Sequence, residues 1–383
     1  MPMFLMVYFL SVFFLLYGGM NFYVFWKIRA AWGEVACVTW AAALFIGLMV
    51  IAPIFIRVLE RHNAIGFSRV LAFVAFIWMA LAFWFLVLGV PGDLWNFGVK
   101  AAAHWRPTAA NCILGPRTQA LAVIVLVAAA AVWGTLEACS IRLKTVRIPT
   151  ARLAQSNGPV RLVQISDVHL SLILGRRTLA RIVDIVNKAQ PDVLVSTGDL
   201  SDGTFVEVNH LGGLLEKVPT RWGKYACFGN HESYAGLENS NAFHESAGFQ
   251  ILHGDAKRAG PLIIAGVDDP AIVPSVSARR EQEKKALDAA HSLGDGPVVL
   301  LKHRPAPDDE SKGQFDLQLS GHTHGGQIFP FGFVVYATSK VWPGTHKISE
   351  GGWLYLSRGT GTWGPPIRFL APPEITAIDL IPG

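Results

Sequence analysis

The first 141 residues are dominated by long apolar stretches. Four of these contain no Asp, Glu, Lys or Arg, and they cover residues 3–26, 35–56, 70–90 and 118–136. Each is close to the roughly 20 residues that a helix needs to cross a bilayer. The first has no basic start and is followed by further apolar stretches, so we interpret it as a retained helix rather than a signal peptide. The pattern predicts a four-helix membrane anchor over residues 1–141, with both ends on one side of the membrane.

From residue 160 onward the pattern changes to short apolar runs that alternate with helical spacing. Residues 161–166, 192–196 and 297–301 read as buried strands, and residues 176–188 carry apolar side chains at helical intervals. Alternating strands and helices indicate an α/β domain, whose ligands gather where strands end. We therefore expect an α/β domain over residues 160–383, joined to the anchor by a juxtamembrane linker over residues 142–159.

The charged residues are distributed unevenly between these two parts. Residues 1–141 hold eight Lys or Arg and four Asp or Glu, whereas the remaining 242 residues hold 25 basic and 24 acidic side chains. Most of the net charge of +5 therefore belongs to the first part. A nucleic-acid surface would need a basic face on the soluble domain, so this balance argues against a nucleic-acid partner.

The basic residues that flank the apolar stretches predict an orientation, because cytoplasmic loops are enriched in Lys and Arg. The side that holds the N-terminus and the 142–152 segment carries seven of them, and the opposite side carries five. This excess favours an inner or plasma membrane protein whose α/β domain lies in the cytoplasm. The spans themselves contain no charged residue that suggests an ion path.

Five short polar motifs follow apolar runs in the second part. They supply carboxylate, imidazole and amide groups, which suit Mn, Fe or Zn, and no cysteine has metal-ligand spacing with another. A dinuclear hydrolase needs two cations about 3.5–4 Å apart, a bridging carboxylate and a water between them. The motif residues are Asp167, His169, Asp199, Asn230, His231, His303, His322 and His324.

Simpler roles exist for the same residues. Asp and Asn after strands are often turn or N-cap residues, so Asp167, Asp199 and Asn230 are individually ambiguous. For His231 the alternative is a further metal ligand or a satisfied polar residue. The joint occurrence with the histidines is what favours a metal site.

The order of these motifs resembles the calcineurin-like metallophosphoesterase superfamily. Asp-x-His, Gly-Asp, Gly-Asn-His-Glu, His and Gly-His-x-His occur in that order across residues 161–327. The downstream Ser357-Arg358-Gly359-Thr360-Gly361 and Arg368 resemble the bacterial membrane-associated branch, which includes UDP-2,3-diacylglucosamine hydrolases and related phosphodiesterases. The resemblance implies a four-layer α/β/β/α sandwich, in which two sheets pack face to face with helices outside.

The resemblance also assigns roles to the motif residues. Asp167, His169 and His324 would hold one divalent ion, Asn230, His303 and His322 the other, and Asp199 would bridge the two. His231 would donate a proton to the leaving oxygen. Arg304, which departs from the family pattern before Pro305, and Arg358 are candidate phosphate contacts.

These expectations describe a membrane-anchored phosphoesterase with two metal ions. The favoured substrate is a phosphodiester or pyrophosphate in a lipid-linked molecule, because four spans exceed what tethering requires. The alternatives are an anchored protein or nucleotide phosphatase, a non-catalytic metal-binding scaffold, and a transporter or receptor with a regulatory domain. Intact His231 argues against the scaffold, and uncharged spans argue against the transporter.

Aromatic residues are concentrated after the double-histidine motif. They are Phe329, Phe331, Phe333, Trp342, Trp353 and Trp363. Aromatic residues in strands are usually core residues, and we expect that role here. A lip that contacts lipid is the alternative.

Overall fold

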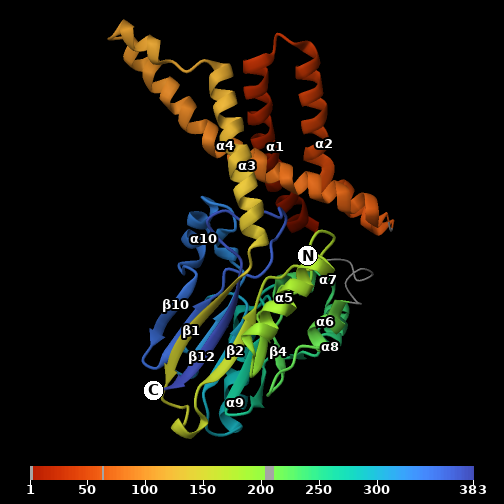
Figure 1. Ribbon diagram of the computed structural model, residues 1–383, viewed down its shortest axis with the longest axis vertical. Coiled ribbons are helices and arrows are strands. Elements are labelled where there is room, and N and C mark those ends of the chain that lie inside the picture. The colour runs from red at the N-terminus through yellow and green to blue at the C-terminus, as the bar shows by residue number, and fades with distance from the viewer. Residues whose placement is uncertain (1–2, 63, 203–210) are drawn as a thin grey trace. The chain divides into compact units, whose positions relative to one another are not determined.

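The computed structural model describes residues 3–62, 64–202 and 211–383 (Figure 1). The chain forms two compact units. One comprises Met1–Thr135 with Gly364–Ile367, and the other comprises Leu136–Trp363 with Arg368–Gly383.

The first unit is helical. Its elements are α1 (Met3–Trp32), α2 (Ala36–Arg61), α3 (Ile65–Ala103), the 3-10 helix η1 (Pro107–Cys112) and α4 (Pro116–Cys139), whose last turn belongs to the second unit. Within the described residues, three segments are long and apolar enough to cross a membrane, namely Ala36–Glu60, Ile65–Ala103 and Pro116–Cys139. The fourth expected span, in α1, stays a prediction.

Helix α3 is longer than the sequence predicts. It continues through Pro91 to Ala103, where we expected a loop from residue 91 to residue 117. A proline usually kinks or ends a helix, but side chains from three helices meet one turn beyond this one. Lys27 of α1 forms an ion pair with Asp93 of α3 and donates to Gln119 of α4 at 2.8 Å. These contacts tie α3 to its neighbours, and they bury a charged pair among helices that we expected to be uncharged.

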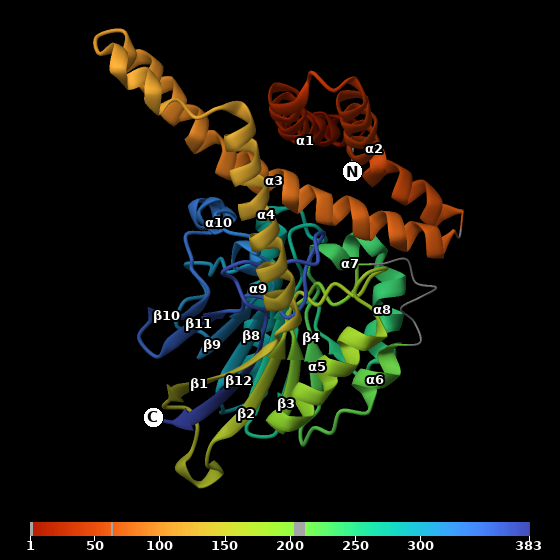
Figure 2. The same cartoon turned by 45° about the horizontal axis from the view of Figure 1, so that its top comes forward.

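Two six-stranded mixed sheets form the second unit. The first has the order β1-β12-β2-β3-β4-β5 and the second β10-β11-β9-β8-β7-β6, and Figure 2 shows the two rows of strands. The strands are β1 (Arg142–Thr150), β2 (Val160–Ile165), β3 (Val193–Ser196), β4 (Lys224–Ala226), β5 (Gln250–Ile251), β6 (Asp255–Ala259), β7 (Leu262–Val267), β8 (Val298–Lys302), β9 (Leu317–Ser320), β10 (Gly344–Ser349), β11 (Gly352–Leu356) and β12 (Glu374–Pro382).

Helices cover the outer faces of both sheets, so the predicted four-layer sandwich is confirmed. The helices and short 3-10 turns of this unit are η2 (Gln155–Asn157), α5 (Arg176–Ala189), α6 (Gly212–Glu216), α7 (Asn230–Ala235), α8 (Leu237–Ser246), α9 (Val276–Ser292), η4 (His324–Gly326) and α10 (Phe331–Ser339). One apolar cluster joins the two sheets, where Leu162 and Val195 pack with Leu301 and Leu319. A second lies under α5 and α8, and a third under α9.

The segment assigned above to a juxtamembrane linker contains a strand. Residues 142–150 form β1, which pairs in parallel with β12 from Arg142 to Thr150. Its alternating burial ends with Ile148 and Thr150 inside, and Ile148 joins the core between the sheets. Only Ser140 and Ile141 separate β1 from the end of α4, so the catalytic unit begins almost directly at a candidate membrane helix.

Candidate metal centre

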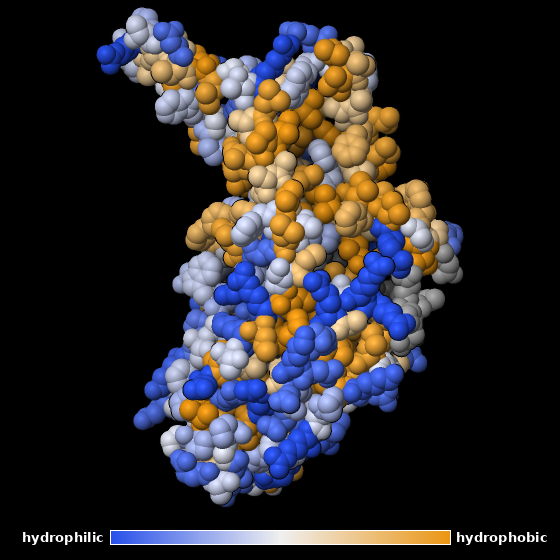
Figure 3. Space-filling view, viewed as in Figure 1, coloured by the Kyte–Doolittle hydropathy of each residue, from blue (hydrophilic) through white to orange (hydrophobic). Residues whose placement is uncertain are grey.

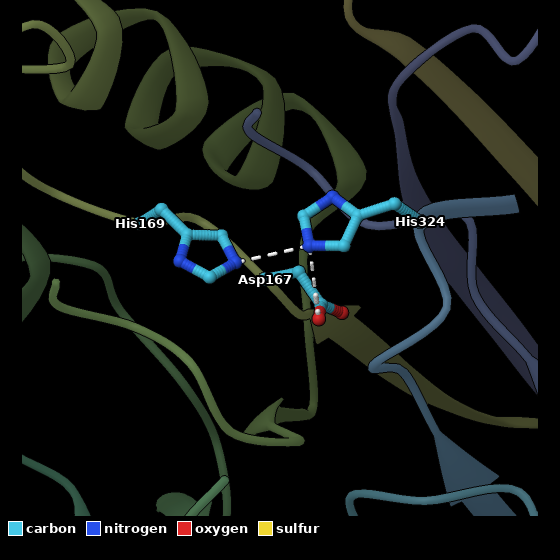
Figure 4. Close-up of side chains that lie close together, drawn as sticks. All are labelled: Asp167, His169 and His324. Carbon is cyan, nitrogen blue, oxygen red and sulfur yellow. Dashed lines mark hydrogen bonds and ion pairs between the residues drawn. The ribbon is translucent and has the colours of Figure 1, made fainter. Parts of the chain in front are cut away.

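Asp167, His169 and His324 meet at one end of the sandwich (Figure 4). The first two follow β2, and His324 begins the turn η4 after β9. Nε2 of His169 lies 3.0 Å from Nε2 of His324, which in turn lies 3.5 Å from Oδ1 of Asp167. All three side chains are buried. Their ligand atoms are close enough to share one cation.

Asp199, His303 and His322 form a second group beside the first. Nε2 of His303 lies 3.2 Å from Oδ2 of Asp199 and 3.2 Å from Nδ1 of His322. The same Asp199 oxygen lies 3.8 Å from Nε2 of His169, a member of the first group. Asp199 therefore lies between the two groups, as a bridging carboxylate would.

Asn230 and His303 show how individual atoms are left available. Among the described residues, Oδ1 of Asn230 is buried without a hydrogen-bond partner. Leaving such an atom unpaired costs about 1–3 kcal/mol, so its position favours a ligand role. His303 donates from Nδ1 to the carbonyl of Thr197 at 2.7 Å, which leaves the lone pair of Nε2 facing Asp199.

The charges of the site suit cations. Burial raises the pKa of Asp167, and the nearby Asp199 adds to this increase. Burial, together with the charge of His303, lowers the pKa of His322 to about 3. Burial also lowers the pKa of His324. Neutral imidazoles beside crowded carboxylates are the protonation states that metal binding requires. The residues present therefore fit a pair of divalent ions.

The backbone at these residues is strained. Asp167, His169, Asp199, His322 and His324 all have φ between 50° and 73°, in the left-handed region. Non-glycine residues rarely adopt this conformation, and it is retained where surrounding contacts enforce it, often at functional sites. The strain turns five side chains toward one point from three different strand ends.

Asp202 is a site residue that sequence reasoning missed. We interpreted it as a turn residue, but its carboxylate forms a hydrogen bond with Nδ1 of His231. Burial opposes protonation of His231, but Asp202 outweighs this effect and raises its pKa. The ring of His231 lies 4.7 Å from that of His169, in an edge-on arrangement. The signal in the sequence was the position of Asp202, three residues after Asp199.

Glu232 holds two motif loops together. Its Oε2 accepts from the amides of Asp199 at 2.9 Å and Gly229 at 2.8 Å, and its Oε1 accepts from Leu200 at 2.8 Å. The side chain is fully buried. This one carboxylate fixes the loop that follows β3 against the loop that precedes α7.

Three arginines lie around the centre. Arg368 is fully buried and donates to the carbonyls of Gly361 at 2.6 and 2.8 Å and of His324 at 3.2 Å, so it supports the His324 turn. Arg304 forms an ion pair with Asp269 at 2.7 Å, and Arg358 lies 3.4 Å from Glu374. The predicted phosphate contacts of Arg304 and Arg358 stay predictions.

Comparisons with known proteins agree with this geometry. Residues 160–326 match the family model described as calcineurin-like phosphoesterase. An uncharacterized metallophosphoesterase from Aquifex aeolicus is 32% identical over 254 residues, which cover 64% of this chain and 94% of that protein. A transmembrane protein with metallophosphoesterase domain from Danio rerio is 33% identical over 279 residues, covering 70% of this chain and 63% of that protein.

The role of Glu232 is testable by an isosteric change. Glu232→Gln replaces one accepting oxygen with a donor, so at least one buried amide loses its partner, at a cost of about 1–3 kcal/mol. We expect a lower midpoint of chemical unfolding and weaker retention of metal on dialysis. The exposed Glu281→Gln is the control and should change neither property. Unchanged unfolding and metal content in Glu232→Gln would contradict the role assigned to Glu232.

Proposed function

The chain belongs to the calcineurin-like metallophosphoesterases, and on that basis we propose that it is a membrane-anchored phosphohydrolase with two metal ions. The observation that carries the proposal is the position of the Asp199 carboxylate between His169 and His303. In the proposed assignment, Asp167, His169 and His324 hold one ion, and Asn230, His303 and His322 hold the other. Mn, Fe or Zn suits this set of oxygen and nitrogen ligands.

The protein side chains divide the work of hydrolysis. Bound divalent ions supply an acidified water and polarise the phosphoryl oxygens. His231 holds a proton near the leaving oxygen, and Asp202 orients its ring and keeps it protonated. Trp363 lies with its ring 5.8 Å from that of His231 and covers one side of the ring. His231 is thus placed for general acid catalysis rather than for binding a metal.

We further propose that the substrate is a phosphodiester or pyrophosphate in a lipid-linked molecule. The support is the helical unit, which holds three candidate membrane spans and, with α1, four. In this arrangement the catalytic unit faces the cytoplasm, on the side with more Lys and Arg. An anchored protein or nucleotide phosphatase is the second candidate, and the choice of substrate in the tests below separates the two.

Asp199→Asn tests the dinuclear arrangement. The substitution removes the charge of a carboxylate placed between both ion sites, so we expect both ions to be held weakly and turnover to be lost. Metal content after dialysis, measured by elemental analysis, is the readout, with the exposed Asp288→Asn as a control. Two tightly held ions and a normal rate in Asp199→Asn would refute the arrangement.

His231→Ala tests the general acid. Such catalysis typically contributes about 10²–10⁴-fold, so kcat should fall by that much on an ester with a poor leaving group. A p-nitrophenyl ester needs little protonation of its leaving group and should lose much less, and metal content should stay nearly unchanged. The exposed His291→Ala should behave like the original protein. Equal losses on both esters would assign His231 a ligand or structural role.

The membrane-substrate proposal is tested by removing the helical unit. A cut near Pro149 would delete most of β1, so the shortened chain should begin at Leu136. We expect its rate on a small soluble ester to match the full chain within a few-fold. Its rate on a substrate embedded in vesicles should fall by about tenfold or more, because tethering raises effective concentration. Equal rates on vesicles would favour the phosphatase with a soluble substrate.

A further inference from the structure

Helix α10 and the residues around it form an exposed apolar surface on the catalytic unit. We name residues 328–342 the α10 segment. Phe333 is 60% exposed, Val334 54% and Trp342 42%, and α10 has no fully buried residue. Figure 3 shows hydrophobic residues gathered over α10. The expectation that the aromatic residues here are core is therefore wrong for Phe333 and Trp342, and it holds for Trp353, which packs against the core between the sheets.

The aromatic side chains of the α10 segment are organised among themselves. The ring of Trp342 stacks on Tyr336 at 4.7 Å and meets the edge of Phe333 at 6.1 Å. Phe333 in turn lies 5.7 Å from Phe329. The exposed surface is thus a packed cluster rather than scattered single residues. Clustered apolar surface of this kind marks an interaction site.

The chemistry of the α10 segment fits a lipid surface. Lys340 is its only charged residue, and the sequence contains no acidic residue between Asp316 and Glu350. Lys340 and Lys347 are both exposed. Trp and Tyr favour the boundary between lipid and water, and basic residues are attracted to anionic headgroups. A short apolar helix with aromatic residues and basic neighbours has the composition of an interfacial anchor.

Printed contacts tie the α10 segment to the end of a candidate membrane helix. Glu137, in the last turn of α4, accepts from the amide of Leu370 at 3.3 Å, and Leu370 is 64% exposed. The adjacent Phe369 accepts from the amide of Phe329 at 3.1 Å and bridges Ile328. The start of α10 is therefore linked through one loop to the point at which α4 leaves the catalytic unit.

The α10 segment also packs against the metal centre. At Gly326, in the turn that begins with His324, an added Cβ would lie 2.3 Å from the backbone of Gly332 in α10. The two backbones are in direct contact, so a displacement of α10 would be felt at the His324 turn. We propose that the α10 segment inserts its aromatic side chains into the lipid–water interface, as a membrane attachment separate from the transmembrane helices, and holds the metal centre at that surface.

The proposal is tested on the full chain by spin labelling, without any measurement of catalysis. Cys37, Cys112 and Cys139 are exposed and are replaced by Ser, while the buried Cys227 is kept. A nitroxide is attached at Val334→Cys or, as a control, at Lys188→Cys on the exposed face of α5. Each protein is placed in nanodiscs of phosphatidylglycerol and phosphatidylethanolamine. Collisions of the label with oxygen, which concentrates in lipid, and with a water-soluble nickel chelate are measured by power saturation.

We expect the ratio of oxygen to nickel collisions to be clearly higher at position 334 than at position 188. A ratio at 334 equal to that at 188 would place the segment in water and overturn the proposal. Low collision rates with both reagents at 334 would mean that protein covers the segment, which also overturns it. Unchanged metal content in the labelled protein verifies that the catalytic unit is intact. Because the readout is lipid contact, its failure leaves the proposed hydrolysis untouched.

Discussion

Two carboxylates buried side by side are the constraint on which the rest of the catalytic unit depends. Asp167 and Asp199 are almost inaccessible to water, and each raises the cost of charging the other. Burial also opposes charging of Asp199, but the charges of His303 and His169 outweigh it and lower its pKa. Burying a charge is tolerated only where opposite charge or hydrogen-bond donors balance it. Divalent ions would supply this balance, which explains why so many imidazoles converge on the same place.

This convergence requires an unusually tight backbone around the carboxylates. At Gly321 an added Cβ would lie 2.2 Å from an Asp167 oxygen, and at Gly229 it would lie 2.2 Å from an Asp199 oxygen. Glycine is therefore required at both positions, because any larger residue would displace a carboxylate. Glu232 and Arg368 complete the arrangement by binding backbone groups of the strained loops. Ligand geometry is thus set by residues that never touch an ion.

The sequence predicted the sandwich and the members of the metal site well, because both leave local signals. Strands such as β2 and β8 are continuous apolar runs, and the motif residues follow them directly. The role of Asp202 was missed because its partner, His231, is brought to it only by the fold. Strand β1 was missed for a related reason. Its exposed positions carry Arg and Lys, which resemble a juxtamembrane linker until β12, more than two hundred residues later, pairs with it.

Strand β1 also changes the mechanical relation between the membrane helix and the site. A flexible linker would let the catalytic unit move away from the bilayer, whereas two residues between α4 and a paired strand leave little freedom. The link from Glu137 to Leu370 restricts that junction further. Because Arg368 lies two residues before Leu370 and holds the His324 turn, the end of the helix and the metal centre share one loop. A site built in this way has its position relative to the membrane helix fixed by the fold itself, and that matters most for a substrate that stays in the bilayer.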